Sequence, residues 1–245
     1  MKKDNIVLNL LVFAEKIENG ALQADLLQEA SDLGFEKVEI RREYFKNLSQ
    51  EKHVIQQRAN DLGIELFYSV PDEVFVEGKV NDCLQSYLEE AKEMGVRHIK
   101  WNIGDFQESS SLDDLEELTN HGIQINVEND QTQGSGTIQP IYQFMEKVSE
   151  KQLSIGYVYD LGNWRFVGEN EQDAVEKLGD YVRYIHVKDV CYQDGKPQAV
   201  ALDKGEIEWR KILSQLPMDI PVAIEYPTTS NKEIFQAKQK LEEWS

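Results

Sequence analysis

One short joint recurs along the sequence at nearly regular intervals. In each copy, a stretch with helical character ends at a glycine and a strand-like segment follows, as in SDLGFEKVEI, NDLGIELFYSV, KEMGVRHIKW and NHGIQINVEND. The four glycines, Gly34, Gly63, Gly95 and Gly122, are 29, 32 and 27 residues apart. Glycine is the residue expected just beyond a helix C-terminus, where the backbone turns left-handed. A period of about 30 residues therefore indicates repeated helix–strand units.

The number of such units predicts the fold. A fifth joint places Gly179 two units beyond Gly122, and 245 residues have room for about eight units. Alternating strands and helices imply a parallel sheet, and eight units favour a closed (β/α)8 TIM barrel, one domain over residues 1–245. A doubly wound nucleotide-binding sheet is less consistent, because the sequence contains neither G-x-G-x-x-G after the first strand nor a P-loop. The expected strands are 5–13, 36–41, 64–70, 97–102, 123–128, 154–160, 182–188 and 220–225, and residues 192–206 form the longest irregular stretch.

Composition excludes several classes of function. With 26 Lys and Arg against 45 Asp and Glu, the formal net charge is −19, which opposes nucleic-acid binding. No apolar run approaches the roughly 18 residues of a membrane span, and no signal-peptide cleavage site follows the N-terminus. Two cysteines, Cys83 and Cys191, are too few for a disulfide framework. We therefore expect a cytoplasmic protein that binds neither nucleic acid nor membrane.

Strand alternation predicts which side chains face the barrel lumen. In YIHVKDV, the apolar Ile185 and Val187 belong against the helices, so His186 and Lys188 face inward. The same argument, applied to the other strands, directs a further set of polar side chains into the lumen: Glu39, Lys100, Asn102, Asn126, Glu128, Asp160 and Glu225.

Four consecutive strands each present one possible metal ligand at the same end: Glu128, Asp160, His186 and Glu225. Three buried carboxylates without partners would cost several kcal/mol each, and a divalent cation relieves that cost. Carboxylate oxygens with one imidazole suit Mn²⁺, Mg²⁺, Co²⁺ or Zn²⁺. Lys100 and Lys188 have two interpretations, either ion pairs with these carboxylates or contacts to substrate. Glu39 has a similar choice between an ion pair and a contact to substrate.

Several motifs, in this order and spacing, resemble the sugar-phosphate isomerase/epimerase superfamily with the xylose-isomerase-like barrel. The resemblance covers nearly the whole chain and rests on GFEKVEIRRE, INVEN, YDLGN, YIHVKD, KGEIEWRKIL and VAIEYP. It implies the same four metal ligands. The chain departs from the family at Asn163, where a histidine is common. It also departs at Gly134 and Tyr192, where ketose 3-epimerases have Glu and Arg. A three-metal endonuclease is excluded, because three of the four histidines (His53, His98 and His121) lie away from the mouth.

The resemblance implies a divalent-metal-dependent isomerase or epimerase of a small sugar or sugar derivative. Glu128 and Glu225 would remove and return the proton α to a carbonyl, through an enolate that the metal stabilises. Substrate oxygens would be held by Glu39, Lys100, Asn163 and Lys188, and the lysines suit an anionic substrate. The alternatives are a dehydratase of a related polyol or keto acid, and a degenerate barrel that binds a sugar or a partner without chemistry.

A homodimer is also possible from the sequence. Four aromatic residues could form a dimer surface or could instead pack the helices onto the barrel: Tyr142, Phe144, Trp209 and Trp244.

Overall fold

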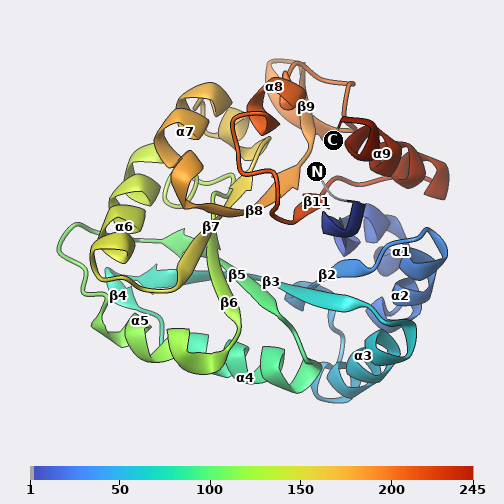
Figure 1. The fold of residues 1–245 in the computed structure, drawn as a ribbon, viewed down its shortest axis with the longest axis horizontal. Coiled ribbons are helices and arrows are strands. Elements are labelled where there is room, and N and C mark those ends of the chain that lie inside the picture. Colours follow the sequence, from blue (N-terminus) through green and yellow to red (C-terminus); the bar gives the residue numbers. More distant parts are fainter. Residues whose placement is uncertain (1–2, 245) are drawn as a thin grey trace.

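A computed structural model, which describes residues 3–244, contains a closed barrel of eight parallel strands (Figure 1). Neighbouring strands pair in chain order around the ring, and β11 returns to β1, as the TIM-barrel prediction requires. The barrel strands are β1 (Ile6–Asn9), β2 (Lys37–Arg41), β3 (Glu65–Val76), β5 (His98–Gly104), β6 (Gln124–Glu128), β7 (Ile155–Asp160), β8 (Val182–Val187) and β11 (Val222–Ile224).

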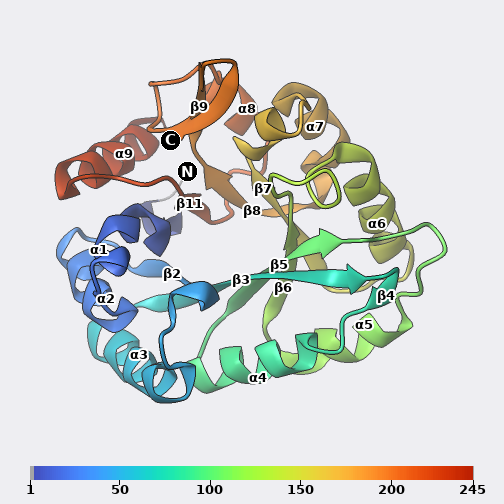
Figure 2. The ribbon, with the colours of Figure 1, turned by 180° about the vertical axis from the view of Figure 1, so that it is seen from behind.

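Helices surround the barrel on the outside (Figures 1 and 2). They are α1 (Ala14–Glu18), α2 (Gln23–Asp32), α3 (Leu48–Leu62), α4 (Leu84–Met94), α5 (Asp113–Leu118), α6 (Ile138–Glu150), α7 (Glu171–Leu178), α8 (Trp209–Leu213) and α9 (Asn231–Trp244). Gly34, Gly63, Gly95 and Gly122 have positive φ values of 67–79°, the left-handed conformation predicted for the joints. Gly179 differs, because its φ of −53° is right-handed and its joint continues into a 3₁₀ turn. Within residues 3–244, no helix is both long enough and apolar enough to cross a membrane.

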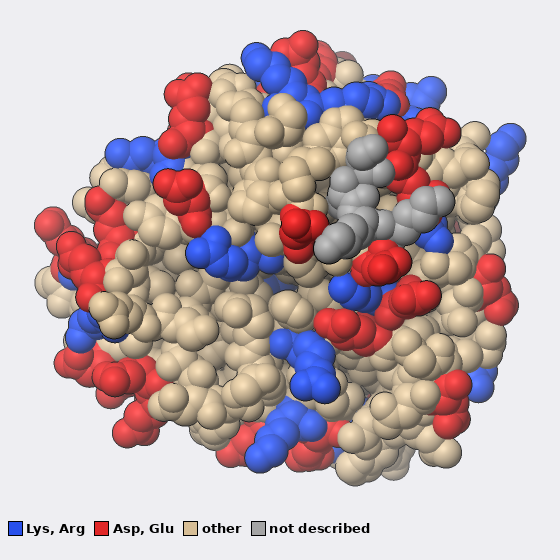
Figure 3. Space-filling model, viewed as in Figure 1, with Lys and Arg blue, Asp and Glu red and all other residues tan. Residues whose placement is uncertain are grey.

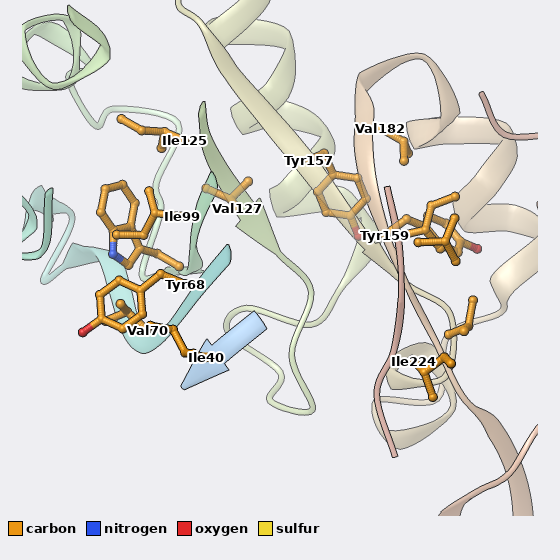
Figure 4. Packing of buried hydrophobic residues seen from close by; sticks show 14 of the residues in the cluster. Ile40, Tyr68, Val70, Ile99, Ile125, Val127, Tyr157, Tyr159, Val182 and Ile224 are labelled. Carbon is orange, nitrogen blue, oxygen red and sulfur yellow. The ribbon is translucent and has the colours of Figure 1, made fainter. Parts of the chain in front are cut away.

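The outward strand residues form the main hydrophobic core between barrel and helices. Ile40, Ile99, Val127 and Ile224 are nearly fully buried there, as strand alternation predicts. Figure 4 shows part of this layer, with aromatic side chains such as Tyr157 among the branched aliphatic ones. Burial of this surface provides most of the apolar driving force for folding.

The lower lumen, toward the strand amino termini, has a separate apolar cluster of Val7, Phe67, Val158, Tyr184 and Ala223. His98 stacks on the Phe67 ring from below, with ring centroids 4.2 Å apart. Along β7, β8 and β11, the inward residue after each member of this cluster is a candidate metal ligand. The cluster is therefore a packed platform directly beneath the charged residues of the mouth.

Two segments differ from the sequence-based prediction. The first strand ends at Asn9 instead of residue 13, because the Asn9 side chain accepts a hydrogen bond from Leu11 N–H and starts a 3₁₀ turn, Leu10–Phe13. The stretch 192–206, expected to be irregular, instead contributes to an antiparallel hairpin of β9 (Asp189–Gln193) and β10 (Lys196–Val200). The turn residues Asp194 and Gly195 both have positive φ, as a tight hairpin turn needs.

Shorter elements complete the chain between the described ends. Strand β3 continues beyond the barrel to Val76 and pairs with β4 (Lys79–Val80) as a second hairpin.

Of the four aromatic residues considered for a dimer surface, Phe144 and Trp209 are buried in the core, and Tyr142 and Trp244 pack against it. These contacts match the packing interpretation.

Candidate metal centre

The ends of β6, β7, β8 and β11 bring the four candidate ligands together. Strand register places Asp160 opposite His186, and Glu225 follows Ile224, which lies opposite Val187. One ligand atom from each of the four residues lies within 4.8 Å of the others: Glu128, Asp160, His186 and Glu225. No side chain in this set is more than 5% exposed, so little water reaches it.

Three donor atoms of this group lack a hydrogen bond of ordinary geometry. Glu128 Oε1, Asp160 Oδ2 and His186 Nδ1 are buried and make no such bond among the described residues, although Lys188 Nζ lies 2.7 Å from Asp160 Oδ2. His186 Nδ1 lies 2.6 Å from Glu128 Oε1 and 3.2 Å from Glu225 Oε2, but neither contact has hydrogen-bond geometry. Buried polar atoms are otherwise almost always satisfied. Oxygen and imidazole donors left open around one point fit a divalent metal ion.

Glu39 on β2 orients His186. Its Oε2 lies 2.9 Å from His186 Nε2 and also accepts from the Tyr184 hydroxyl, while its Oε1 accepts from Asn9 Nδ2 at 2.7 Å. A proton on Nε2 that donates to Glu39 leaves the Nδ1 lone pair directed at the ligand group. The sequence left Glu39 open between an ion pair and a substrate contact. Its full burial and occupied oxygens favour the orienting role instead.

The YDLGN motif fixes Asp160. Its Oδ1 accepts the backbone N–H groups of Gly162 and Asn163 at 3.0 and 3.1 Å, whereas Oδ2 accepts no backbone N–H group. The Asn129 side chain holds the Asp160 backbone, because its Nδ2 donates to the Asp160 carbonyl oxygen and its Oδ1 accepts from the Asp160 N–H. The Asn163 side chain donates to the backbone carbonyl oxygen of Asn129 at 2.8 Å. Asn163 thus supports this corner of the mouth.

Three cationic side chains pair with the candidate ligands. Lys188 Nζ lies 2.7 Å from Asp160 Oδ2 and 3.0 Å from Glu225 Oε2, and Lys100 forms an ion pair with Glu128. Lys188 also donates to Asn163 Oδ1 at 3.2 Å. The third cation is Arg41, which pairs with Glu225. Of the two interpretations open for the lysines, the ion-pair one describes this structure.

Burial and neighbouring charge oppose each other at these side chains. Burial raises the pKa of the Asp160 carboxyl to about 7, although the Lys188 ammonium opposes the rise. At Glu225, burial acts in the same direction, but Lys188 and His186 outweigh it and hold the pKa well below its usual range. At His186, burial lowers the pKa, yet the surrounding carboxylates, first that of Glu39, bring it well above the usual value. The carboxylates thus depend on nearby cations to stay ionised.

Three further residues of the site did not emerge as candidates from the sequence. Arg41 Nη1 donates to Glu225 Oε1 at 2.8 Å, and Asn9 Nδ2 donates to the same oxygen at 3.0 Å. Tyr184 contacts Glu39. Strand alternation contains the signal for all three, because Arg41 follows inward Glu39 by two residues and Tyr184 precedes inward His186 by two. Asn9 is likewise two residues beyond inward Val7.

Solved structures of similar fold cover nearly the whole chain at low identity. The IolI protein with a bound zinc atom is 15% identical, with a TM-score of 0.71 over 98% of this chain and 96% of that one. The probable 3-DHS dehydratase AsbF from Bacillus anthracis is also 15% identical, with a TM-score of 0.71 over 98% of each chain. D-psicose 3-epimerase from Clostridium cellulolyticum H10, solved with D-tagatose, is 12% identical, with a TM-score of 0.71 over 98% of each chain.

No sequence among the curated proteins matches this chain. The similarity to the solved structures establishes a shared fold, and the comparison with family models establishes the family. The model of the family described as the xylose isomerase-like TIM barrel matches residues 27–244, which include all four candidate ligands. The chain therefore belongs to the family of xylose isomerase-like TIM barrels.

Proposed function

We propose that this chain is a divalent-metal-dependent isomerase or epimerase of a small sugar or sugar derivative. The observation that carries the proposal is the convergence of four buried ligand atoms, within 4.8 Å of one another, at the carboxyl end of the barrel: one each from Glu128, Asp160, His186 and Glu225. In barrels of this type, the carboxyl ends of the strands are where catalytic residues lie. The zinc atom in the IolI structure and the epimerase activity named for a second similar structure support the same proposal.

Glu128, Asp160, His186 and Glu225 would hold the metal. When bound, the metal would supply Lewis-acid polarisation of a substrate carbonyl, which makes the neighbouring C–H more acidic. Glu128 ends β6 and Glu225 directly follows β11, and these two strands are separated on the ring by β7 and β8. A substrate between them would meet one carboxylate on each side. One glutamate would take the α-proton, and the other would return a proton to the product.

The polar side chains around this group would bind and orient the substrate. Lys100 and Lys188 pair with candidate ligands, and Asn163 Oδ1 accepts a hydrogen bond from Lys188. Glu39 keeps His186 in one orientation. At 4% and 7% exposed, Lys188 and Lys100 act where water is largely excluded, which strengthens each interaction with a substrate oxygen.

A dehydratase is the second candidate, because loss of a β-hydroxyl can follow the same α-proton abstraction. The similarity to the probable dehydratase AsbF supports it. A binding barrel without chemistry is the third, since Asn163 and Tyr192 stand where the family commonly has His and ketose 3-epimerases have Arg.

Exchange of a substrate α-proton with D₂O tests the proposal before the net reaction is known. The chain, loaded with Mn²⁺ or Zn²⁺, is incubated with a panel of ketoses, inososes and sugar acids, and deuterium at the α-carbon is measured by NMR. We expect exchange on at least one compound, and loss of that exchange after chelation. Water elimination in addition to exchange would identify a dehydratase. If no compound exchanges although the metal binds, the binding barrel would replace the enzyme.

A further inference from the structure

Each carboxylate of the candidate metal set already has a cationic partner from the chain. Lys188 pairs with Asp160 and Glu225, Lys100 pairs with Glu128, and Arg41 makes a second contact to Glu225. The two lysines lie on strand β5 and directly after strand β8, so they approach the group from different sides of the ring. Their ammonium groups neutralise the carboxylates that a bound dication would otherwise neutralise.

The position of Lys188 is built into the fold. Its side chain is only 6% exposed, and its aliphatic stem runs against Gly162. A Cβ added at Gly162 would lie 2.4 Å from Lys188 Cγ, closer than any real contact. Since Gly162 has an ordinary φ of −91°, the glycine is required here by the close approach of Lys188 and not by backbone strain. The stem of Lys188 is therefore held at the mouth by packing against Gly162.

A metal and the Lys188 ammonium would compete for one oxygen. Two backbone N–H groups occupy Asp160 Oδ1, so Oδ2 is the oxygen that remains for a metal. Lys188 Nζ lies 2.7 Å from that same oxygen. Coordination by Asp160 requires Lys188 to leave it, and a buried ammonium without a counter-ion is costly. The displaced lysine then needs another anion.

The two displaced ammonium groups indicate what that anion is. Lys100 and Lys188 are 7% and 4% exposed, so neither regains full hydration when a metal takes its carboxylate. A substrate with a carboxylate or phosphate would give both ammonium groups a new partner, whereas an uncharged sugar would leave them without one.

We propose that a divalent metal displaces Lys100 and Lys188 from their carboxylates, and that the two freed ammonium groups then bind a carboxylate or phosphate of the substrate. This inference rests on the proposed function and narrows its substrate to anionic hydroxy-carbonyl compounds. Binding of metal and of the anionic group is thereby coupled, and each must strengthen the other by the same factor.

Titration calorimetry on the full chain tests the coupling with three probes: D-gluconate for a carboxylate, D-fructose 6-phosphate for a phosphate, and D-fructose as the uncharged control. We expect at least one anionic probe to bind the Mn²⁺-loaded protein more tightly than the metal-free protein, by a factor in the usual range for coupled sites, about 5- to 150-fold. D-Fructose should show no such gain. The anionic probe that binds identifies the group.

Lys188→Met separates the inference from the proposed function. Removal of the competing ammonium should tighten Mn²⁺ binding by about tenfold or more and weaken the anionic probe by a similar factor. Lys188→Gln serves if the methionine variant does not fold. Lys151→Met, which removes an exposed lysine paired with Asp113, is the matched control and should change neither affinity.

The outcomes are distinct. If Mn²⁺ binds the wild type but both Lys188 variants leave its affinity unchanged, the lysine is no stand-in cation and the inference is overturned, while the proposed function survives. Equal binding of D-fructose and the anionic probes overturns the anion subsite in the same way. If no protein binds Mn²⁺ or Zn²⁺, the proposed function and the inference both fail.

Discussion

The two levels of the barrel lumen are built from the same strands and have opposite chemistry. Val158, Tyr184 and Ala223 belong to the apolar lower level, and two residues further along their strands stand Asp160, His186 and Glu225. Two residues of strand correspond to about 6.6 Å. Within that distance the lumen changes from packed apolar side chains to a buried network of charges. The comparison indicates that the lower level contributes apolar packing, whereas the upper level holds the candidate ligands.

The amino-terminal face shows that an open hollow alone does not identify a functional site. A hollow of about 750 Å³ lies at this end and is lined in part by the joint glycines Gly63, Gly95 and Gly122. Figure 3 shows this face, on which acidic and basic side chains are interspersed without one large patch of either sign. The four convergent ligands lie at the opposite end of the strands, where the fold places catalytic groups.

The largest expected effect is on proton transfer at the upper level. Glu128→Gln and Glu225→Gln keep the side-chain shape and an oxygen for the metal but remove the acid–base function. Each should lower the α-proton exchange rate or turnover by about 10²–10⁴-fold, the usual contribution of general acid–base catalysis. Replacement of the glutamate that takes the first proton should abolish exchange. Replacement of its partner should allow exchange but block turnover. Full turnover by both variants would refute these roles.

An opposite result is expected one level lower. Phe67→Ala removes a ring that is 1% exposed and that contacts both His98 and Tyr184. The free energy of unfolding should fall by about 3–5 kcal/mol, the typical cost of a large cavity, while Mn²⁺ affinity stays unchanged in the folded protein. Denaturant unfolding and calorimetry provide the two readouts. A large loss of metal affinity without loss of stability would contradict the division between the levels.

An intermediate effect is expected at Glu39, which supports His186 from below. Glu39→Gln keeps the shape but removes the charge opposite His186 Nε2. Loss of such an outer partner typically costs 10–100-fold in metal affinity, and we expect Mn²⁺ binding to weaken by about that factor. Glu65→Gln, which alters a carboxylate near His98 at the amino-terminal end, is the matched control. Unchanged binding by the Glu39 variant would exclude the orienting role.

The smallest effect concerns an ion cluster outside the lumen. Asp203 contacts Trp209, Arg210 and Lys240, and the hydrogen bonds from Arg210 lower its carboxyl pKa below the usual range. The folded state thus binds fewer protons than the unfolded chain, so this stabilisation is present above about pH 4 and is lost as pH falls further. Asp203→Asn should lower the melting temperature by about 1–3 °C at pH 7, because exposed pairs contribute little. The deficit should shrink steadily in melts as pH falls from about 4 toward 2. A constant deficit would contradict the assignment.

Sequence patterns predicted the barrel because the repeat of about 30 residues depends on short local segments. The left-handed glycines at four of the joints and the alternation along each strand depend on a few neighbouring residues, so the direction of the candidate ligands could be inferred: Glu128, Asp160, His186 and Glu225.

Distances and depth within the lumen could not be inferred in the same way. Alternation indicates that Lys188 points inward but not that it reaches Asp160 Oδ2, because this contact joins residues of different strands and depends on the space at Gly162. The depth of Glu39 likewise results from the stagger of β2 against β1 and β3. The hairpin β9–β10 could have been found, since its Asp194-Gly195 turn is a strong local signal.

Anomalous diffraction from crystals grown with Mn²⁺ tests the metal centre most directly. We predict one strong peak at the mouth, with oxygens of Glu128, Asp160 and Glu225 and Nδ1 of His186 at about 2.0–2.2 Å, the range for carboxylate and imidazole ligands. Lys188 should no longer contact Asp160 Oδ2. The contradicting result is a mouth without an anomalous peak at saturating Mn²⁺, in which Lys100 and Lys188 keep their ion pairs.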